Sequence, residues 1–197
     1  WGALAVAGRE VLFSTSNGAR ALHAVIGGGP IFVGSLRNAS AVCARALAAA
    51  ERLAETDEAA SEVCVVCSGL DGRPAVDDSL CAGWLIQTLR PEAARLGARV
   101  TLGAGARRAL ALLARRRAAY AGSDADARAW LARALDATPA ARGVRAVGLG
   151  ADIAWCADVD ASTAIPQVVG EDAARSLVII EKAPLEDLAL PDLEDAR

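Results

Sequence analysis

The sequence predicts an α/β protein, folded as a three-layer α/β/α sandwich around a mostly parallel or mixed sheet. The first observation is a repeated unit: three times before Arg90, a short β-branched run is followed by a polar loop and then by a helical run. Such alternation is typical of parallel strands covered by helices. The second observation is the composition, because 54% hydrophobic and 23% charged residues indicate a folded chain rather than a disordered one.

The individual elements follow from the spacing of apolar residues. Strands are expected at 10–13, 31–33, 63–67 and 177–180. Helices are expected at 19–26, 39–55, 78–89, 104–120 and 124–135. The segment 140–150 is interrupted by glycine and receives no assignment. No interval is typical of a linker between domains, so residues 1–184 are expected to form a single α/β domain and residues 185–197 an acidic C-terminal tail.

Charge and hydropathy exclude two classes of partner. The chain has 21 Lys and Arg against 24 Asp and Glu, which gives a net charge of −3. Nucleic acid is therefore not an expected partner, since it demands a basic face. A bilayer span needs about 18 or more apolar residues without charges. The sequence contains no such run, so no membrane association is expected.

The five cysteines and the first residue indicate the compartment and the start of the protein. An odd number of cysteines, scattered through apolar runs, favours reduced thiols, so a cytoplasmic location is expected. The chain contains no Met and begins at Trp1, so the domain is expected to be N-terminally incomplete. The sequence does not fix the oligomeric state, and a homo-oligomer stays open.

The loop after the first predicted strand has the features of an anion site. It lies where a strand ends and a helix begins, which is where open α/β sheets bind ligands. Ser16 supplies a hydroxyl, and the Asn17-Gly18 pair tolerates the positive φ that turns main-chain N–H groups inward. Arg20, in the first helical turn, could bind phosphate or sulfonate oxygens. The alternative is an ordinary strand-to-helix turn with capping side chains.

The next two loops carry further polar residues. The second loop offers Ser35, Arg37 and Asn38, although Asn38 is also a good N-cap for the following helix. The third loop leads into Asp77 and Asp78. Adjacent carboxylates at a helix start either favour the helix dipole or hold a divalent cation such as Mg²⁺. Beside a loop rich in hydroxyls, they are what metal-assisted phosphate chemistry needs.

Four segments in one order resemble the 2-phosphosulfolactate phosphatase family. They are 15–22, 34–42, 76–83 and 148–153, the last followed by Cys156, Asp160 and Pro166. The resemblance covers about residues 6–180 and implies a three-layer α/β/α fold. It also implies Mg²⁺-dependent hydrolysis of a phosphate monoester, 2-phosphosulfolactate, to 3-sulfolactate and phosphate. In the archetypal pathway this reaction leads to coenzyme M.

The resemblance implies roles for the matching positions of this sequence. Catalytic roles fall to Asp78, Asp77 and Arg20, and the same two aspartates are the expected metal ligands. The small anionic substrate, which carries phosphate and sulfonate, is expected to contact Ser16, Asn17, Gly18, Ser35, Arg37 and Asn38. Asp152 is a further candidate polar contributor.

The sequence also departs from the family. Nothing in it matches the strand and helix with which members usually begin, whose motif is similar to Asp-Val-Leu-Arg-Ala-Thr. The acidic pair is Asp77-Asp78, where the family more often has Glu-Asp. Two alternatives therefore stay open: a non-catalytic domain that binds a phosphorylated ligand, and a phosphatase that acts on a related phospho-acid.

Overall fold

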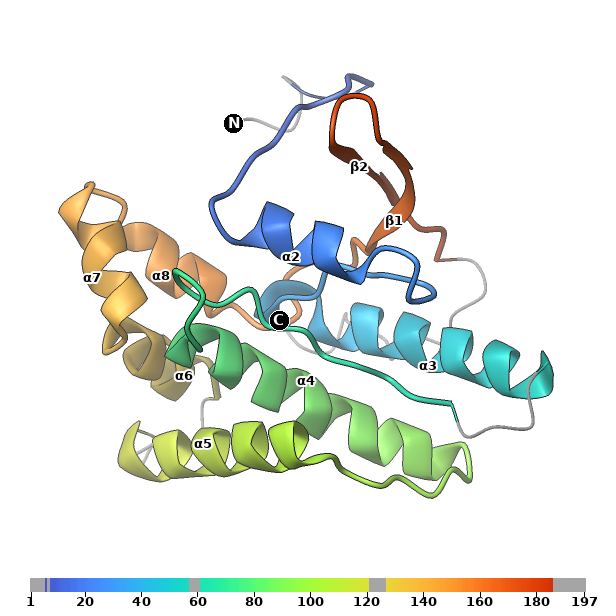
Figure 1. Cartoon of the computed structure of the whole chain (residues 1–197). Coiled ribbons are helices and arrows are strands. Elements are labelled where there is room, and N and C mark those ends of the chain that lie inside the picture. Colours follow the sequence, from blue (N-terminus) through green and yellow to red (C-terminus); the bar gives the residue numbers. More distant parts are fainter. Residues whose placement is uncertain (1–5, 7, 57–60, 121–126, 186–197) are drawn as a thin grey trace.

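The computed structural model describes residues 6, 8–56, 61–120 and 127–185 (Figure 1). In chain order its elements are α2 (Gly18–Val25), the 3-10 turn η1 (Leu36–Asn38), α3 (Ala39–Thr56), α4 (Val76–Arg95), α5 (Ala104–Tyr120), α6 (Ala127–Asp136), α7 (Pro139–Ala146), α8 (Ala151–Cys156), β1 (Pro166–Asp172) and β2 (Leu177–Lys182). Among these described helices, none combines the length and the apolar character that a bilayer crossing requires.

The larger hydrophobic core lies where α4 meets α5 and α6. Leu80 of α4, Leu113 of α5 and Leu131 of α6 are at most 2% exposed. The ring centroids of Trp84 and Trp130 lie 6.1 Å apart in the same cluster. Burying one large apolar side chain stabilises a fold by about 1.5–3 kcal/mol. This cluster therefore anchors α4, whose first turn carries the predicted acidic pair.

Helices α4 and α5 approach each other so closely that one position requires glycine. A Cβ atom on Gly83 would lie 2.7 Å from the main-chain oxygen of Ala109 and 3.0 Å from the Cβ of Leu113. The nearer contact is with backbone, which cannot rotate away as a side chain can. The glycine in the middle of α4 is thus explained by helix packing.

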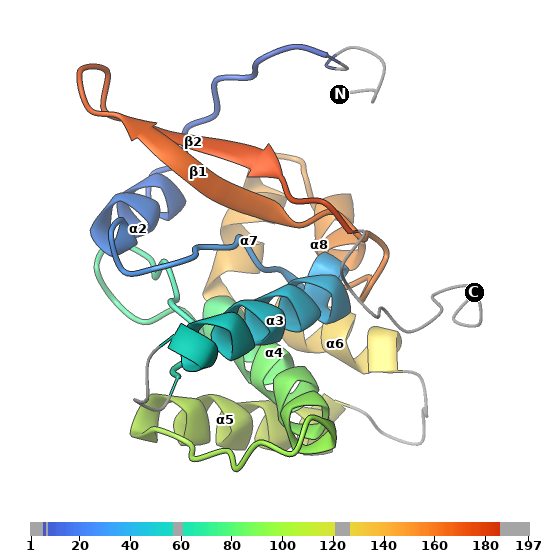
Figure 2. The same ribbon diagram turned by 90° about the vertical axis from the view of Figure 1, so that its right-hand side faces the viewer.

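The sheet of the described residues is an antiparallel hairpin beside α3. Its register runs from Pro166 opposite Lys182 to Asp172 opposite Leu177. Figure 2 shows the hairpin on one side of α3, with α4 and α5 on the other. A second apolar cluster joins these layers, and its buried members are Ala39, Ala41, Val42, Cys43, Leu85, Ile165 and Ala183.

The predicted mixture of helices and strands is confirmed, but the three-layer sandwich with a mostly parallel sheet is not. In the described part of the chain the sheet has two antiparallel strands. The predicted strand 31–33 meets β1 through an antiparallel bridge between Phe32 and Gln167. The predicted strands 10–13 and 63–67 have no strand partner there. An apolar run identifies residues that suit a strand, but a strand also needs a neighbour that supplies main-chain hydrogen bonds.

The helix predictions agree better, because helices depend on local spacing. Helix α5 has the predicted bounds, and α2 and α3 match within one residue at each end. Helix α4 extends beyond the prediction through Pro91, and its last turns bury Ala93. Part of the predicted helix 124–135 lies outside the described residues, and α6 covers the rest. Helices α7 and α8 and strand β1 were not predicted.

Replacing Gly83 with alanine should destabilise the protein by about 1–3 kcal/mol, because the added methyl group overpacks the contact between α4 and α5. The measurement is the free energy of unfolding in urea. Gly143→Ala in α7 is the matched control, since nothing lies within 4 Å of its added Cβ. The control should gain about 0.5–1 kcal/mol from helix propensity. Equal effects of the two substitutions would contradict the packing explanation.

Candidate functional site

The first and third predicted loops contact each other. The main-chain N–H of Asp71 donates to Asn17 Oδ1 at 3.4 Å. Asp71 has a left-handed backbone with φ of 51°, in a turn closed by paired hydrogen bonds between Leu70 and Arg73. The structure thus brings the Asn17 loop to the turn that precedes α4, as the expected site requires.

The start of α2 is set by Thr15 and Gly18. Thr15 Oγ1 accepts the main-chain N–H of Ala19 at 3.1 Å, so Thr15 closes the first turn of α2 from two residues before the N-cap residue, Asn17. A Cβ on Gly18 would lie 2.8 Å from that same oxygen, so glycine allows this hydrogen bond to form. Ser16 and Arg20 flank this turn, and both are exposed. Both side chains are therefore accessible to a ligand from solvent.

Asp78 holds the loop that precedes its own helix. Its Oδ2 accepts the main-chain N–H of Gly69 at 2.6 Å and the hydroxyl of Ser68 at 3.2 Å. A short hydrogen bond from an amide to a carboxylate is charge-assisted and strong. Both contacts fall on one oxygen, so a cation at Asp78 would bind through the other one, Oδ1.

Burial disfavours the charged form of Asp77. Burial raises the pKa of Asp77, main-chain N–H groups of its helix lower it, and the charge of Asp78 raises it further. Both carboxylates also raise the pKa of Cys67, after the larger effect of burial. The charges of Asp77 and Asp78 therefore both act on Cys67, the last residue of the segment 63–67. A cation there would relieve the repulsion between the two carboxylates.

The second loop reaches the same region through Cys81. The pKa of the Cys81 thiol is raised to about 12, mainly by burial and then by Cys67 and Asp78. A hydrogen bond from the Leu36 backbone opposes this shift. Leu36 begins η1, so the turn after residues 31–33 lies against the first turns of α4. The three predicted loops are thus linked by this chain of contacts.

Ser35 and Asn38 bind each other, and of the two Asn38 is buried while Ser35 is exposed. Asn38 Oδ1 accepts the Ser35 main-chain N–H at 2.7 Å and the Ser35 hydroxyl at 2.9 Å. Asn38 Nδ2 donates to the main-chain oxygens of Val33 and Ala164 at 3.1 and 2.9 Å. Asn38 is 5% exposed. Its amide shapes the turn, and a direct contact of either residue with substrate stays a prediction.

Arg37 is held by α8 and the segment after it. Its Nη1 donates to the main-chain oxygen of Trp155 at 2.8 Å and lies 3.5 Å from an Asp158 carboxylate oxygen. Its guanidinium carbon lies 3.6 Å from the centroid of the Trp155 ring, which is a cation–π contact. Asp152, exposed in the first turn of α8, shares a neighbour with Arg37, because both charges act on the pKa of Cys156.

The contacting loops carry candidate groups for an anion and for a cation. Exposed donors lie at the start of α2, and two carboxylates lie at the start of α4. Within the described residues, no three His, Cys, Asp or Glu side chains come together as a metal site. Mg²⁺ needs only one or two protein carboxylates and takes its other ligands from water and substrate. The pair Asp77 and Asp78 therefore suits Mg²⁺ better than a metal that requires a full protein cage.

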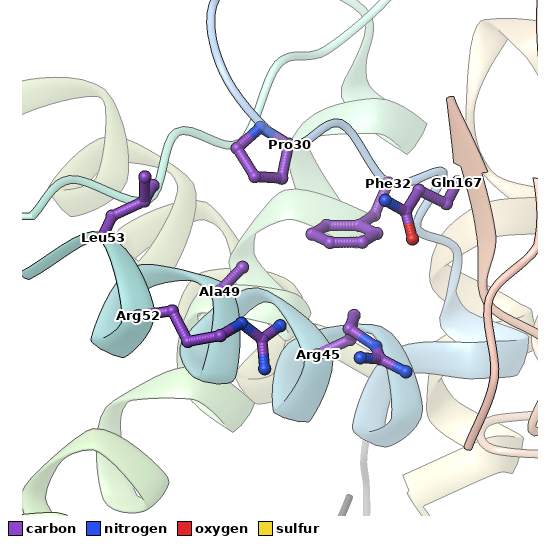
Figure 3. A pocket seen from close by; sticks show the side chains of 7 residues that line it. All are labelled: Pro30, Phe32, Arg45, Ala49, Arg52, Leu53 and Gln167. Atoms are coloured by element: carbon purple, nitrogen blue, oxygen red, sulfur yellow. The ribbon is translucent and has the colours of Figure 1, made fainter. Parts of the chain in front are cut away.

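A cavity of about 270 Å³ lies elsewhere, between α3 and the chain at residues 30–32. Its lining residues are Pro30, Phe32, Arg45, Ala49, Arg52, Leu53 and Gln167. Figure 3 shows the Phe32 ring between Pro30 and the face of α3 that carries Ala49. No predicted site residue lines this cavity, so the candidate site is the surface where the loops meet.

Comparison with known proteins identifies the family. The family model of 2-phosphosulpholactate phosphatase matches residues 3–171. The chain is 37% identical over 166 residues to a probable 2-phosphosulfolactate phosphatase of Thermus thermophilus, covering 84% of this chain and 59% of that protein. Proteins of the same name from Symbiobacterium thermophilum and Deinococcus radiodurans are 34% and 38% identical over 82 and 86 residues, about two fifths of this chain and one third of theirs.

The chain therefore belongs to the 2-phosphosulfolactate phosphatase family, and the resemblance found in its motifs is confirmed. It spans 59% of the length of the Thermus relative. The matched region contains all of the predicted site residues.

Iodoacetamide at pH 8 should separate the cysteines into two groups. The pKa of Cys43 is raised to about 12, mainly by burial, as is that of Cys81. At pH 8 a thiol of pKa near 12 is about one part in ten thousand thiolate. Burial also raises the pKa values of Cys64, Cys67 and Cys156, but these three side chains are accessible to the reagent. The exposed Cys64, Cys67 and Cys156 should react first, as peptide mass spectrometry would show. Unfolded protein is the control, and equal native rates would contradict the burial of Cys43 and Cys81.

Proposed function

We propose that this chain takes part in the Mg²⁺-dependent hydrolysis of a phosphate monoester, 2-phosphosulfolactate, to 3-sulfolactate and phosphate. The observation that carries the proposal is the contact between the Asn17 loop and the turn held by Asp78. It occurs in a chain whose family model and relatives are named for this activity. The loop supplies donors and the helix supplies carboxylates, and phosphate ester hydrolysis with a metal needs both.

The phosphate would bind at the start of α2. The main-chain N–H groups there carry partial positive charge, and an anion at this position needs little rearrangement. Ser16 and Asn17 add side-chain donors, and Gly18 leaves room for Thr15 Oγ1 to bind the first turn of α2. Arg20, exposed in the first turn, adds a full positive charge and two parallel hydrogen bonds.

The second anionic group of the substrate would face Arg37. The 35–38 turn lies against the first turns of α4 through Leu36 and Cys81. Ser35 and Asn38 would act there by fixing the turn, because their side chains bond to each other and to the backbone. A guanidinium suits sulfonate and carboxylate alike, so this part of the site would favour a substrate with two charged ends.

The metal is proposed on grounds of charge. Asp77 and Asp78 would repel a phosphorylated, sulfonated substrate unless a cation lay between them. Burial already disfavours the charged form of Asp77, which its raised pKa shows. Bound Mg²⁺ would neutralise phosphoryl charge and lower the pKa of a bound water. In this proposal Asp77 and Asp78 hold the cation, and the α2 loop orients the phosphate.

The thiols support a reducing compartment for this reaction. All five cysteines are free, and two of them lie exposed near each other in the sequence at Cys64 and Cys67. An oxidising compartment would put such exposed thiols at risk of disulfide formation. We therefore place the activity in the cytoplasm.

Phosphate release from 2-phosphosulfolactate and from phospholactate, with and without Mg²⁺, tests the proposal. Release should require Mg²⁺ and should favour 2-phosphosulfolactate. Equal turnover of phospholactate would instead indicate a phosphatase for a related phospho-acid. Protection of the fold by 2-phosphosulfolactate without any release would indicate a domain that only binds a phosphorylated ligand. Release that is unchanged in excess EDTA would remove the metal from the proposal.

Asp78→Asn should lower Mg²⁺-dependent kcat/KM by about a hundredfold, because the amide replaces a charged ligand with a neutral one. The asparagine oxygen can still accept the Gly69 N–H, so the loop should keep its shape. Asp172→Asn in the hairpin is the control, since Asp172 also accepts a main-chain N–H, from Arg175 at 3.1 Å. Steady-state kinetics across a Mg²⁺ titration is the measurement. Unchanged turnover in Asp78→Asn would exclude Asp78 as a metal ligand.

A further inference from the structure

The segment after α8 lies along the turn that carries Arg37. The main-chain N–H of Asp160 donates to the Leu36 oxygen at 3.1 Å. The main-chain N–H of Ser162 donates to the Arg37 oxygen at 2.8 Å. These bonds join residues more than a hundred positions apart, so they arise from the fold and not from local sequence. They fix the backbone of the turn on both sides of Arg37.

Asp160 also caps α3 from a distance. Its Oδ1 accepts the Ser40 main-chain N–H and its Oδ2 accepts the Ser40 hydroxyl, both at 2.7 Å. Ser40 lies in the first turn of α3, where main-chain N–H groups lack partners within the helix. A carboxylate there is stabilised by hydrogen bonding and by the helix dipole. Both carboxylate oxygens of Asp160 therefore accept hydrogen bonds from the protein itself.

The backbone of Asp160 is itself unusual. Its φ is 55°, in the left-handed region that residues other than glycine rarely adopt, although Asp and Asn adopt it more readily than most. A conformation of this kind costs free energy and persists where surrounding contacts determine it. Here the contacts are the two bonds to Ser40 and the bond to Leu36.

The end of α8 and the segment after it hold the side chain of Arg37. The Trp155 oxygen and ring and the Asp158 carboxylate all contact its guanidinium, and the whole Arg37 side chain is 18% exposed. Residues 155–162 thus contact Arg37 both at its main-chain oxygen and at its guanidinium. If η1 and the first residues of α3 moved, the Arg37 guanidinium would lose its contacts with Trp155 and Asp158.

We propose that Asp160 is a positioning residue, which acts through Ser40 and the 36–38 turn to hold Arg37 in place for the anionic substrate. The inference rests on the proposed function for its catalytic consequence, but the positioning itself does not. Asp160 would not touch substrate, since both of its oxygens bind Ser40. Its removal should therefore weaken substrate binding and leave the chemical step nearly unchanged.

The test compares Asp160→Ala with Asp160→Asn. Asp160→Ala should raise KM for 2-phosphosulfolactate by about tenfold and change kcat by less than about threefold. Asp160→Asn should restore KM to within about threefold of the original protein, because its oxygen still accepts the Ser40 N–H and asparagine tolerates positive φ. In an Arg37→Ala background, Asp160→Ala should raise KM no further. A rise of equal size in both backgrounds would show that Asp160 does not act through Arg37.

Thr138→Ala is the matched control for lost stability. Thr138 Oγ1 caps α7 by accepting the Ala141 N–H at 3.2 Å, so its loss also removes a helix cap. The control should lower thermal stability without changing KM. If Asp160→Ala behaves in the same way, Asp160 is only structural and the inference is overturned. Should Asp160→Ala fail to fold, Ser40→Ala removes one of the two bonds and should raise KM by about two- to threefold.

Amide hydrogen exchange tests whether Asp160 fixes the turn, and this test does not depend on phosphatase activity. Peptides that cover residues 36–40 should exchange faster in Asp160→Ala than in the original protein, in Asp160→Asn or in Thr138→Ala. Unchanged exchange in Asp160→Ala would overturn the inference. If the original protein releases no phosphate from 2-phosphosulfolactate, the proposed function fails, while faster exchange in Asp160→Ala would still establish that Asp160 fixes the turn.

Discussion

The buried amide of Asn38 is the constraint on which the candidate site depends. A buried side-chain amide must have its hydrogen bonds satisfied, because an unpaired donor or acceptor costs about 1–3 kcal/mol. Asn38 meets this demand with two bonds to Ser35 and one each to the oxygens of Val33 and Ala164. It thereby ties the end of segment 31–33, the turn and the chain that enters β1. The backbone position of Arg37 in this turn therefore depends on the Asn38 junction together with the main-chain bonds from Asp160 and Ser162.

The sequence predicts the helices of this protein more fully than its sheet. The bounds of α5 could be predicted because apolar residues at helical spacing are enough to define a buried face. The strand residues at 31–33 could also be identified, but their antiparallel partner in β1 could not. Pairing joins Phe32 to Gln167, and no local pattern encodes a contact over that separation. The end of α4 was missed for another reason, since Pro91 signals a break that packing at Ala93 overrides.

The residues of the candidate site also divide into those with a local sequence signal and those without one. Asn17 and Asp78 were candidates because of their residue types in loops that precede predicted helices, and the structure joins these loops through hydrogen bonds at Asn17 and Asp78. Their roles at the site stay predictions. Asp160 and Trp155 carried no such signal, because each acts on a turn more than a hundred residues earlier. Asp160 belonged to a motif of the family resemblance, which marked the position without a role. Only the three-dimensional contacts supply the role.

The carboxylates of these loops differ in how their charge is stabilised, and this difference indicates where a cation belongs. Asp160 and Asp78 both accept main-chain N–H groups, at 2.7 and 2.6 Å, so the protein itself stabilises their negative charge. Asp77 lies in the same helix turn as Asp78, yet burial raises its pKa despite nearby N–H groups. A buried carboxylate that the protein leaves insufficiently stabilised gains most from a bound cation. In the proposed site, Asp77 would therefore be the ligand whose charge Mg²⁺ stabilises most, and Asp78 would complete the pair while it holds the loop.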